Sequence, residues 1–402
     1  MNDTEKIWAK LEELDFRIST DTRKPLPRSA FFALKGESFD GNDFVEEALK
    51  NGAECVVTEN KKFSSLPKVF VVESSLGTLQ EMAGRYRGLF NIPVIVIGGS
   101  NGKTTTKDLV TLVLARRFKT ASTEGNLNNE IGVPLSLFSL GKETEIGVFE
   151  IGANHPGEHT ALLKIARPTH VIVTNSGLDH LEGFGSPEAV VKANNEISEW
   201  AEAHGAEIIA YRDYELKVLS PLPLSLSLGQ KKFKTKLVGK YNLENINGAL
   251  RVAELFGIES EEALEAISSY EPREFRSQVV ERGKNTFVVD CYNANPSSMS
   301  LSLESFFETA PSPRGLILGD MLELGSYAEA EHEKIIKSLV GKPIDFAVFV
   351  GKHFKQVLGK TGFKGLAFAD SAEARDWLSK QNFSGYTILL KGSRGMKIER
   401  VL

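Results

Sequence analysis

Apolar residues in this chain alternate between short continuous runs and segments with helical spacing. Residues 94–97 are four consecutive β-branched residues, Val-Ile-Val-Ile, which is typical of a strand buried on both faces. Residues 103–118 follow with apolar side chains at helical spacing, namely Leu109, Val110, Leu112, Val113 and Phe118. Strands that alternate with helices in this way predict a parallel sheet covered on both faces.

The alternation continues through the middle of the chain and restarts near residue 272. Further strands are expected at residues 147–152, at 170–175 and, less clearly, at 207–211, with a helix at 249–256. Beyond residue 272 we expect strands at 286–290, 315–319, 346–350 and 386–390, and helices at 300–309, 329–339 and 372–380. This second set predicts a separate, open α/β sheet of the Rossmann-like kind.

Residues 1–88 predict a smaller α/β unit. Its strand candidates are 31–34, 55–58 and 69–72, and Gly52 is expected to close a helix at 44–51. A chain of 402 residues is too long for one hydrophobic core. We therefore predict an α/β protein of three domains, at residues 1–88, 89–271 and 272–402, the central one built on a mostly parallel, P-loop-type sheet.

The turn after the strand at 94–98 has the composition of a phosphate-binding loop. Its residues are Gly99, Ser100, Asn101, Gly102, Lys103, Thr104 and Thr105. Backbone N–H groups without helical partners point at an anion there, and the helix dipole favours negative charge. Lys103 is expected to reach the terminal phosphates of a nucleotide, and a threonine hydroxyl to bind Mg²⁺. The generic pattern G-x-x-x-x-G-K-[ST] would begin at Ile97, so the loop is short, and an ordinary glycine-rich turn is the alternative.

Polar residues fall at or just past the ends of the central strands, where ligands gather in such sheets. They are Glu150, Asn175, Asp179 and His180. A carboxylate inside an apolar strand requires a partner, and a carboxylate with an imidazole is able to hold Mg²⁺ against bound phosphates. For His180 alone, a structural role is the stronger alternative.

Asn242 and Asn245 lie three residues apart and share one face of the next helix. Their amides are suited to an adenine edge, and helix N-capping is an equally good interpretation.

The C-terminal sheet carries three polar clusters, each directly after a strand. They occupy residues 290–299, 319–325 and 391–394. Because the strands of one sheet end at the same edge, the clusters predict a single binding surface that faces the nucleotide.

Composition and charge limit which partners and which cellular compartment are expected for the chain. The formal net charge is −5 and no basic stripe is present, which argues against nucleic acid as a main partner. Cys55 and Cys291 are far apart and suggest a reducing compartment. The first residues lack the apolar stretch of a signal peptide, and no apolar run is long enough to span a bilayer. We expect a cytoplasmic protein without membrane insertion, and a monomer.

Several motifs together resemble the Mur ligases. They are Gly99-Ser-Asn-Gly-Lys-Thr-Thr105, Gly125-Asn-Leu-Asn-Asn-Glu-Ile-Gly-Val-Pro134, Asp290-Cys-Tyr-Asn-Ala-Asn-Pro-Ser-Ser-Met299, Leu318-Gly-Asp-Met-Leu-Glu-Leu-Gly325 and Lys391-Gly-Ser-Arg-Gly-Met396. The glycine loop is shared by the whole superfamily, including folylpolyglutamate synthases. The stretches after residues 290 and 318 are more specific, and they resemble the members that add D-alanyl-D-alanine. The resemblance runs from about residue 20 to the C-terminus.

The resemblance implies an ATP-dependent ligase whose first domain grips a uridine nucleotide. The second domain binds ATP, and the third closes over both and brings the amine. It places Lys103, Glu150 and His180 in catalysis, and Thr104, Glu150 and His180 at Mg²⁺. The resemblance also implies that Asn242, Asn245 and Arg276 contact ATP. Substrate contacts would come from Thr22, Arg23, Lys35, Gly36, Glu37, Asp40 and Gly41, from Asn126, Asn128 and Asn129, and from Asp290, Tyr292, Asn293, Asn295, Lys391 and Ser393.

The implied reaction joins D-Ala-D-Ala to UDP-MurNAc-tripeptide. The tripeptide carboxylate attacks the γ-phosphorus of ATP, and the dipeptide amine then displaces phosphate from the acyl phosphate. Mg²⁺ and Lys103 neutralise charge at the phosphates, so catalysis is mostly positioning and electrostatics. Closure of the third domain would exclude water from the acyl phosphate.

One position departs from the family pattern. These ligases usually carry a carbamylated lysine two residues before a glutamate, where this chain has Asn194. Asparagine takes no carbamate, and Lys192 would point to nearly the opposite side of a helix. We expect an active enzyme that needs no carbamate.

Two alternatives stay open at this point. One is another amide-forming member of the superfamily, such as the ligase that adds the third amino acid or a folylpolyglutamate synthase. The other is a catalytically silent nucleotide-binding paralogue.

Overall fold

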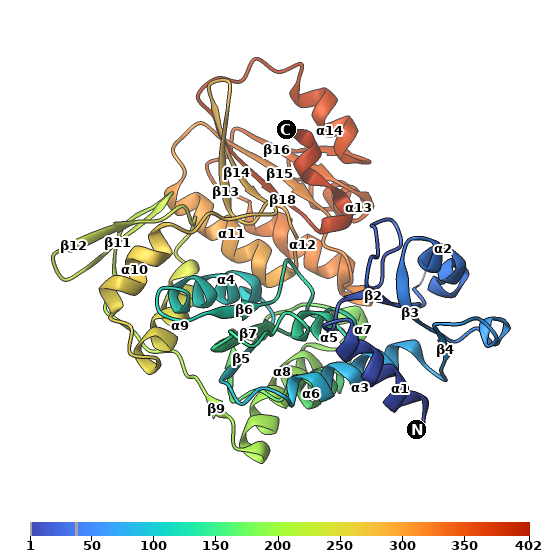
Figure 1. Ribbon diagram of the computed structural model, residues 1–402. Coiled ribbons are helices and arrows are strands. Elements are labelled where there is room, and N and C mark those ends of the chain that lie inside the picture. Colours follow the sequence, from blue (N-terminus) through green and yellow to red (C-terminus); the bar gives the residue numbers. More distant parts are fainter. Residues whose placement is uncertain (1, 37–38) are drawn as a thin grey trace. The chain divides into compact units, whose positions relative to one another are not determined.

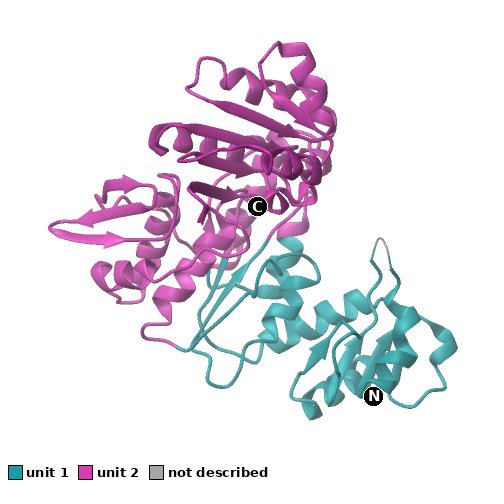
Figure 2. Cartoon of the chain, turned by 90° about the horizontal axis from the view of Figure 1, so that it is seen from above, with its two compact units in different colours: residues 1–96, 119–151, 160–170 teal, residues 97–118, 152–159, 171–402 magenta. Residues whose placement is uncertain are grey.

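The computed structural model describes residues 2–36 and 39–402, and its elements are labelled in Figure 1. Glu37, a predicted substrate contact, lies outside the described residues. The chain forms two compact units. Unit 1 comprises Met1–Val96, Lys119–Ile151 and Thr160–His170, and unit 2 comprises Ile97–Phe118, Gly152–His159 and Val171–Leu402 (Figure 2).

The N-terminal part of unit 1 is a parallel four-stranded sheet with strand order β1-β2-β3-β4. Its strands are β1 (Ile18–Ser19), β2 (Ser29–Phe32), β3 (Ala53–Thr58) and β4 (Val69–Val71), and its helices are α1 (Asp3–Glu13), α2 (Val45–Lys50) and α3 (Ser75–Arg87). The three predicted strands are confirmed. The predicted helix at 44–51 is confirmed as α2, which a 3₁₀ turn, η1 (Gly41–Phe44), precedes, and Gly52 follows it with φ +100°.

The central sheet has five strands in the order β6-β7-β5-β8-β9. They are β5 (Val94–Gly98), β6 (Thr120–Ser122), β7 (Ile146–Glu150), β8 (His170–Val173) and β9 (Glu207–Ile208). Unit 1 holds α5 (Gly132–Leu137) beside β6 and β7, and α6 (Glu158–Ala166) carries residues of both units. The continuous burial of β5 follows from its β-branched run.

Unit 2 contains the remaining helices of the central segment and a small hairpin sheet. The helices are α4 (Lys103–Leu114), α7 (Leu181–Phe184), α8 (Pro187–His204), α9 (Asn242–Leu255) and α10 (Ser260–Ser268). The hairpin sheet, which the sequence analysis missed, is antiparallel and consists of β10 (Lys217–Pro221), β11 (Leu224–Leu228) and β12 (Lys231–Lys234).

The C-terminal part of unit 2 is a six-stranded sheet with strand order β13-β14-β18-β15-β16-β17. Its strands are β13 (Gln278–Arg282), β14 (Asn285–Asp290), β15 (Arg314–Gly319), β16 (Phe346–Val350), β17 (Leu366–Phe368) and β18 (Thr387–Lys391). Only β13, paired with β14, runs antiparallel, so the sheet is mixed. Its helices are α11 (Pro296–Thr309), α12 (Ala328–Ser338), α13 (Lys352–Thr361) and α14 (Ser371–Leu378).

Alternate residues of this sheet fill two cores. Leu316, Leu318 and Phe349 face a core with α11, α12 and α13, to which α7 and α8 of the central segment also contribute. Ile317 and Val348 face the opposite core, beneath α14 and the C-terminal 3₁₀ turn η5 (Ile398–Val401). Burial on both faces explains why these strands are continuous apolar runs in the sequence. Among the described residues, no helix combines the length and apolar character needed to span a bilayer.

Candidate functional site

The loop between β5 and α4 depends on two glycines. Gly99 has φ +113° and Gly102 has φ +81°, conformations that L side chains rarely adopt. A Cβ at Gly99 would lie 2.4 Å from Thr174 Oγ1, and a Cβ at Gly102 would lie 2.4 Å from Asn245 Oδ1. At both positions the backbone therefore lies so close to these side chains that only glycine fits.

Side chains of the loop and of the segment after β8 fix the loop's shape. Lys103 Nζ donates to Gly99 O at 2.7 Å and to Ser100 O at 3.0 Å, so it curls back over the loop. Asn175 Oδ1 accepts from Asn101 N at 3.0 Å, and Asn175 Nδ2 donates to Asn101 O at 3.0 Å. Thr104 is buried and Thr105 is half-buried, both in the first turn of α4. The N–H groups at the start of α4 lack helical partners and lie at a helix N-terminus, which suits a phosphate.

Behind the loop lies a short chain of buried hydrogen bonds. Ser100 Oγ donates to Asp179 Oδ1 at 2.6 Å, and Asn194 Nδ2 donates to Ser100 Oγ at 3.1 Å. Asn194 is buried on α8 and Lys192 is exposed, so the expected orientation of the two residues is confirmed. An amide at position 194 thus supports the loop serine.

His180 follows Asp179 and adopts a left-handed backbone conformation with φ +47°. Its Nδ1 pairs with the carboxylate of Glu323, which lies in the cluster after β15, and this hydrogen bond lowers the pKa of Glu323. With Nδ1 engaged, Nε2 is the nitrogen left for a ligand.

Asn242 and Asn245 are both buried on α9, and they connect it to α4. Asn242 Nδ2 donates to Val238 O at 2.7 Å, Asn245 Nδ2 donates to Asn242 Oδ1 at 2.8 Å, and Thr106 Oγ1 donates to Asn245 Oδ1 at 3.1 Å. No side-chain cap bond forms at the start of α9, so the N-capping interpretation is wrong.

The third-domain residues meet at the edge of the C-terminal sheet, as the sequence predicts for the three clusters. Lys391 Nζ donates to Asp290 Oδ2 at 2.7 Å in a pair whose lysine side chain is 2% exposed. Ser393 Oγ donates to Ala294 O at 3.0 Å and accepts from Leu322 N at 2.8 Å, which ties the three clusters together. The Arg276 guanidinium lies 3.5 Å from the centre of the Tyr292 ring.

Two hydrogen bonds join these third-domain residues directly to the central segment. Asn295 Nδ2 donates to Asn101 Oδ1 in the loop at 2.9 Å. Ser297 Oγ accepts from Leu178 N at 2.8 Å. Asn295 also caps α11, whereas Asn293 is exposed and accepts from Ala294 N.

Glu150 ends β7 in unit 1, and it is 1% exposed. Asn128 Nδ2 donates to its Oε1 at 2.6 Å, and its other oxygen, Oε2, is buried without a hydrogen-bond partner among the described residues. A buried carboxylate oxygen without a donor suits a bound cation. Asn129 Oδ1 accepts from Gly132 N at 2.9 Å, and Asn126 is exposed.

The predicted substrate contacts of the N-terminal sheet lie in two loops. Arg23 is exposed and pairs with Asp21, whose pKa its hydrogen bonds lower to about 2. Thr22 O accepts from Asn51 Nδ2 at 2.8 Å. Lys35 Nζ lies 3.8 Å from Asp40, Gly36 N donates to Phe39 O, and Asp40 also caps η1, which begins at Gly41.

No group of three or more His, Cys, Asp or Glu side chains suited to a metal ion occurs in the described residues. Mg²⁺ takes few protein ligands and keeps waters beside substrate phosphates. Within unit 1 the orphaned oxygen of Glu150 suits such an ion, and within unit 2 the Nε2 of His180 does.

Sequence comparison assigns each of the three segments to one family. Profiles described as Mur ligase family, catalytic domain, as Mur ligase middle domain and as Mur ligase, glutamate ligase domain match residues 17–83, 97–222 and 275–394. The UDP-N-acetylmuramoyl-tripeptide–D-alanyl-D-alanine ligases of Bacillus subtilis and Escherichia coli are each 31% identical over 96% of this chain and 92% of their own lengths. The chain belongs to the Mur ligase family.

Solved Mur ligase structures share the whole architecture. MurF from Acinetobacter baumannii is 28% identical with a TM-score of 0.84, covering 98% of this chain and 97% of that one. The MurF ligase of Thermotoga maritima, solved in complex with ADP, is 28% identical with a TM-score of 0.79 and 96% coverage of both chains. The predicted α/β Mur ligase architecture, with N-terminal, central parallel-sheet and C-terminal domains, is confirmed.

Sequence reasoning missed several residues that complete the site of this Mur ligase. Glu323, Ser297 and Thr106 lie inside or beside quoted motifs, so the motifs themselves were the available signal. Tyr241 and Ser277 form a hydrogen bond although they are 36 residues apart in the sequence, and no local sequence pattern indicates such a pair.

Proposed function

We propose that this Mur ligase joins D-alanyl-D-alanine to UDP-N-acetylmuramoyl-tripeptide at the expense of ATP, giving the pentapeptide, ADP and phosphate. Relatives with this activity in their names align over nearly the whole chain. The observation that carries the proposal is the 2.9 Å hydrogen bond from Asn295 to Asn101, because it sets the motif specific to these relatives against the phosphate loop.

The reaction proceeds in two displacements. The tripeptide carboxylate forms a bond to the γ-phosphorus as the bond to ADP breaks, and the amine then attacks the acyl carbon as phosphate leaves. Lys103, once its bonds to Gly99 O and Ser100 O yield to the nucleotide, places its charge on the phosphates. The loop N–H groups hold the same charge without reorganisation.

Thr104, Glu150 and His180 are the residues proposed to hold Mg²⁺. The partnerless oxygen of Glu150 and the Nδ1 bond that orients His180 support this assignment. The ion, when bound, supplies neutralisation of the phosphate charge.

The remaining residues keep the roles that the resemblance implies. Asn242 and Asn245 are proposed for the adenine side, since each amide nitrogen retains a second hydrogen beyond the one it donates to Val238 or Asn242. Arg276 is proposed for phosphate. The proposed contacts of the uridine nucleotide are Thr22, Arg23, Lys35, Gly36 and Asp40. The same proposal assigns Asn126, Asn128 and Asn129 to the substrate. The proposed contacts on the amine side are Asp290, Tyr292, Asn293, Asn295, Lys391 and Ser393. The boundaries 1–88, 89–271 and 272–402, the cytoplasmic location and the monomeric state remain predictions.

We further propose that turnover needs no carbamylated lysine. Asn194 takes that place and donates to Ser100, a bond that requires no CO₂. Rates measured in bicarbonate-depleted and bicarbonate-supplemented buffer are expected to agree within twofold. Loss of activity on depletion, restored by bicarbonate, would contradict this proposal.

Phosphate release with UDP-MurNAc-tripeptide, D-Ala-D-Ala and ATP, each omitted in turn, tests the function. Release is expected only with all three present. Replacing D-Ala-D-Ala by single amino acids, glutamate among them, tests for another ligase of the superfamily, which would release phosphate with one of these amines instead. A protein that binds ADP but releases no phosphate with the full set is a silent nucleotide-binding paralogue.

A further inference from the structure

A buried chain of hydrogen bonds links the start of α9 to the Asp290–Lys391 pair. Tyr241 OH lies 2.7 Å from Ser277 Oγ. Ser277 donates to Asp290 Oδ1 through its backbone N at 3.2 Å and through its Oγ at 3.3 Å. Lys391 Nζ donates to the other carboxylate oxygen. Every link of this chain lies within unit 2.

The protons of this chain have one arrangement that satisfies every acceptor. When Ser277 Oγ donates its single hydroxyl hydrogen to the Asp290 carboxylate, Tyr241 donates to Ser277 Oγ. Burial, and then the nearby charge of Asp290, raise the pKa of Tyr241, so its hydroxyl keeps its proton. Consecutive donors that end on a carboxylate polarise and strengthen one another.

The other end of the chain reaches the phosphate loop. Tyr241 directly precedes Asn242, the first residue of α9. Asn242 accepts from Asn245, which accepts from Thr106 on α4 and packs closely on Gly102 of the loop. The nucleotide loop and the third-domain pair are therefore joined by one continuous set of contacts.

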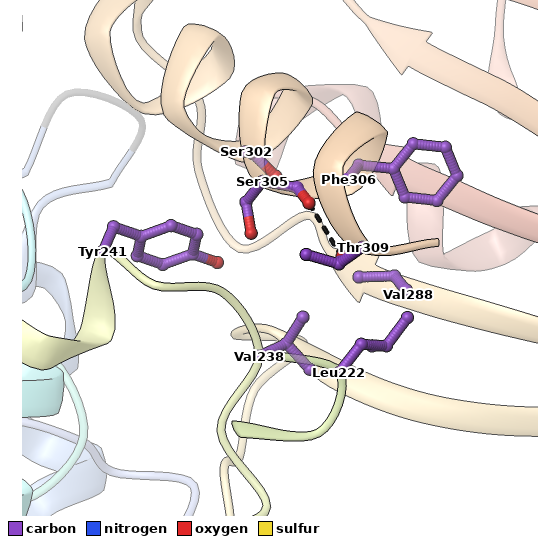
Figure 3. A pocket seen from close by; sticks show the side chains of 8 residues that line it. All are labelled: Leu222, Val238, Tyr241, Val288, Ser302, Ser305, Phe306 and Thr309. Atoms are coloured by element: carbon purple, nitrogen blue, oxygen red, sulfur yellow. Dashed lines mark hydrogen bonds between the residues drawn. The ribbon is translucent and has the colours of Figure 1, made fainter. Parts of the chain in front are cut away.

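The Tyr241 ring packs closely on Gly239, where an added Cβ would lie 2.3 Å from Tyr241 Cε1. The ring also borders a small cavity together with Leu222 and Val238, and with Ser302, Ser305 and Phe306 of α11 (Figure 3). Ser305 Oγ is buried there without a hydrogen-bond partner among the described residues. The hydroxyl bond to Ser277 and the packing of the ring therefore position Tyr241 together.

The backbone on the Ser277 side is strained. Glu274, Phe275 and Ser277 have φ values of +54°, +60° and +51°, in the left-handed region that is unfavourable for residues other than glycine. Such a segment keeps its conformation only where surrounding contacts determine it. The bonds of Ser277 to Tyr241 and Asp290 are contacts of this kind.

We propose that Tyr241 and Ser277 are positioning residues that set the Asp290–Lys391 pair in register with the phosphate loop and thereby determine the affinity for the amine substrate. The amine part of this inference rests on the proposed function. Neither residue touches substrate, and both act through Asp290.

Tyr241→Phe removes only the hydroxyl. We expect the KM for D-Ala-D-Ala to rise about tenfold, the effect of losing one net hydrogen bond in a buried network, with the KM for ATP and for UDP-MurNAc-tripeptide unchanged within twofold. Ser277→Ala should do the same, and the double variant should equal Ser277→Ala, because Tyr241 acts only through Ser277. The matched control is Tyr270→Phe, which loses a 3.0 Å tyrosine–carboxylate bond to Asp108 in the same unit and should leave all three KM values unchanged.

Hydrogen exchange gives a readout that is independent of turnover. Amides near residues 290–293 and 391–393 should exchange faster in Tyr241→Phe and not in Tyr270→Phe. Unchanged exchange together with an unchanged amine KM would overturn the inference, as would equal increases in all three KM values. A wild-type protein that fails to use D-Ala-D-Ala would refute the proposed function, and with it the part of the inference that concerns amine affinity. Hydrogen exchange would still decide whether Tyr241 positions the Asp290–Lys391 pair.

Discussion

Two connections join the phosphate loop to the third domain within unit 2, and they differ in burial. The first consists of Asn101–Asn295, Leu178–Ser297 and His180–Glu323, between side chains that are partly open to solvent. The second runs through Tyr241, Ser277 and Asp290 to the buried Lys391. Water can replace a lost partner in the first connection but not in the second. Bonds of similar length therefore differ in how much their loss costs.

Each connection includes a contact of the loop, Asn101 in the first and Gly102 in the second, so a change in the loop should have the largest effect. Lys103→Ala removes the charge on the phosphates and the ties to Gly99 and Ser100. We expect phosphate release to fall about a thousandfold and ADP affinity, measured by calorimetry, to fall with it. Lys119→Ala, an exposed lysine of unit 1, is the matched control and should behave as wild type. A Lys103→Ala enzyme within tenfold of wild type would contradict the proposed role.

The buried connection is tested next by Lys391→Met. It keeps the apolar stem but leaves the Asp290 carboxylate without its cation, which should destabilise the fold by about 3 kcal/mol and lower the midpoint in scanning calorimetry. The double variant Asp290→Asn with Lys391→Met removes both charges and should recover more than half of the loss. If the double variant is no more stable than Lys391→Met, an unpaired buried charge is not the cause.

The partly exposed connection should tolerate a single loss. Ser297→Ala removes the acceptor for Leu178 N, and we expect at most about a threefold decrease in kcat/KM, because water can take the place of the hydroxyl. Ser300→Ala, exposed on the same helix, is the control. A decrease beyond thirtyfold would show that the two connections do not differ as their burial indicates.

The sequence was most informative where structure is determined locally. Four β-branched residues, two glycines in turn positions and Lys103 were enough to predict the strand, loop and helix, although α4 ends at Leu114 and not at 118. The C-terminal strands were readable because burial on both faces makes them continuous apolar runs.

Some helices and short strands were missed. Of the missed helices, only α3 has a weak contrast between its faces; α1 and α13 have distinct apolar and polar faces, and their pattern was overlooked. The strand β1 has only two residues, too few for a pattern. The predicted strand at 207–211 shortened to β9, Glu207–Ile208, whose residues are exposed. The bond between Tyr241 and Ser277 depends on how two distant segments pack, which no window of sequence contains.

The clearance around Gly99 has a consequence for the evolution of this enzyme. With Thr174 Oγ1 only 2.4 Å from where a methyl group would begin, even alanine is shut out of that position. An inhibitor that touches only this stretch of main chain would leave no substitution at position 99 that gives resistance, and a saturation library at that position should return glycine alone.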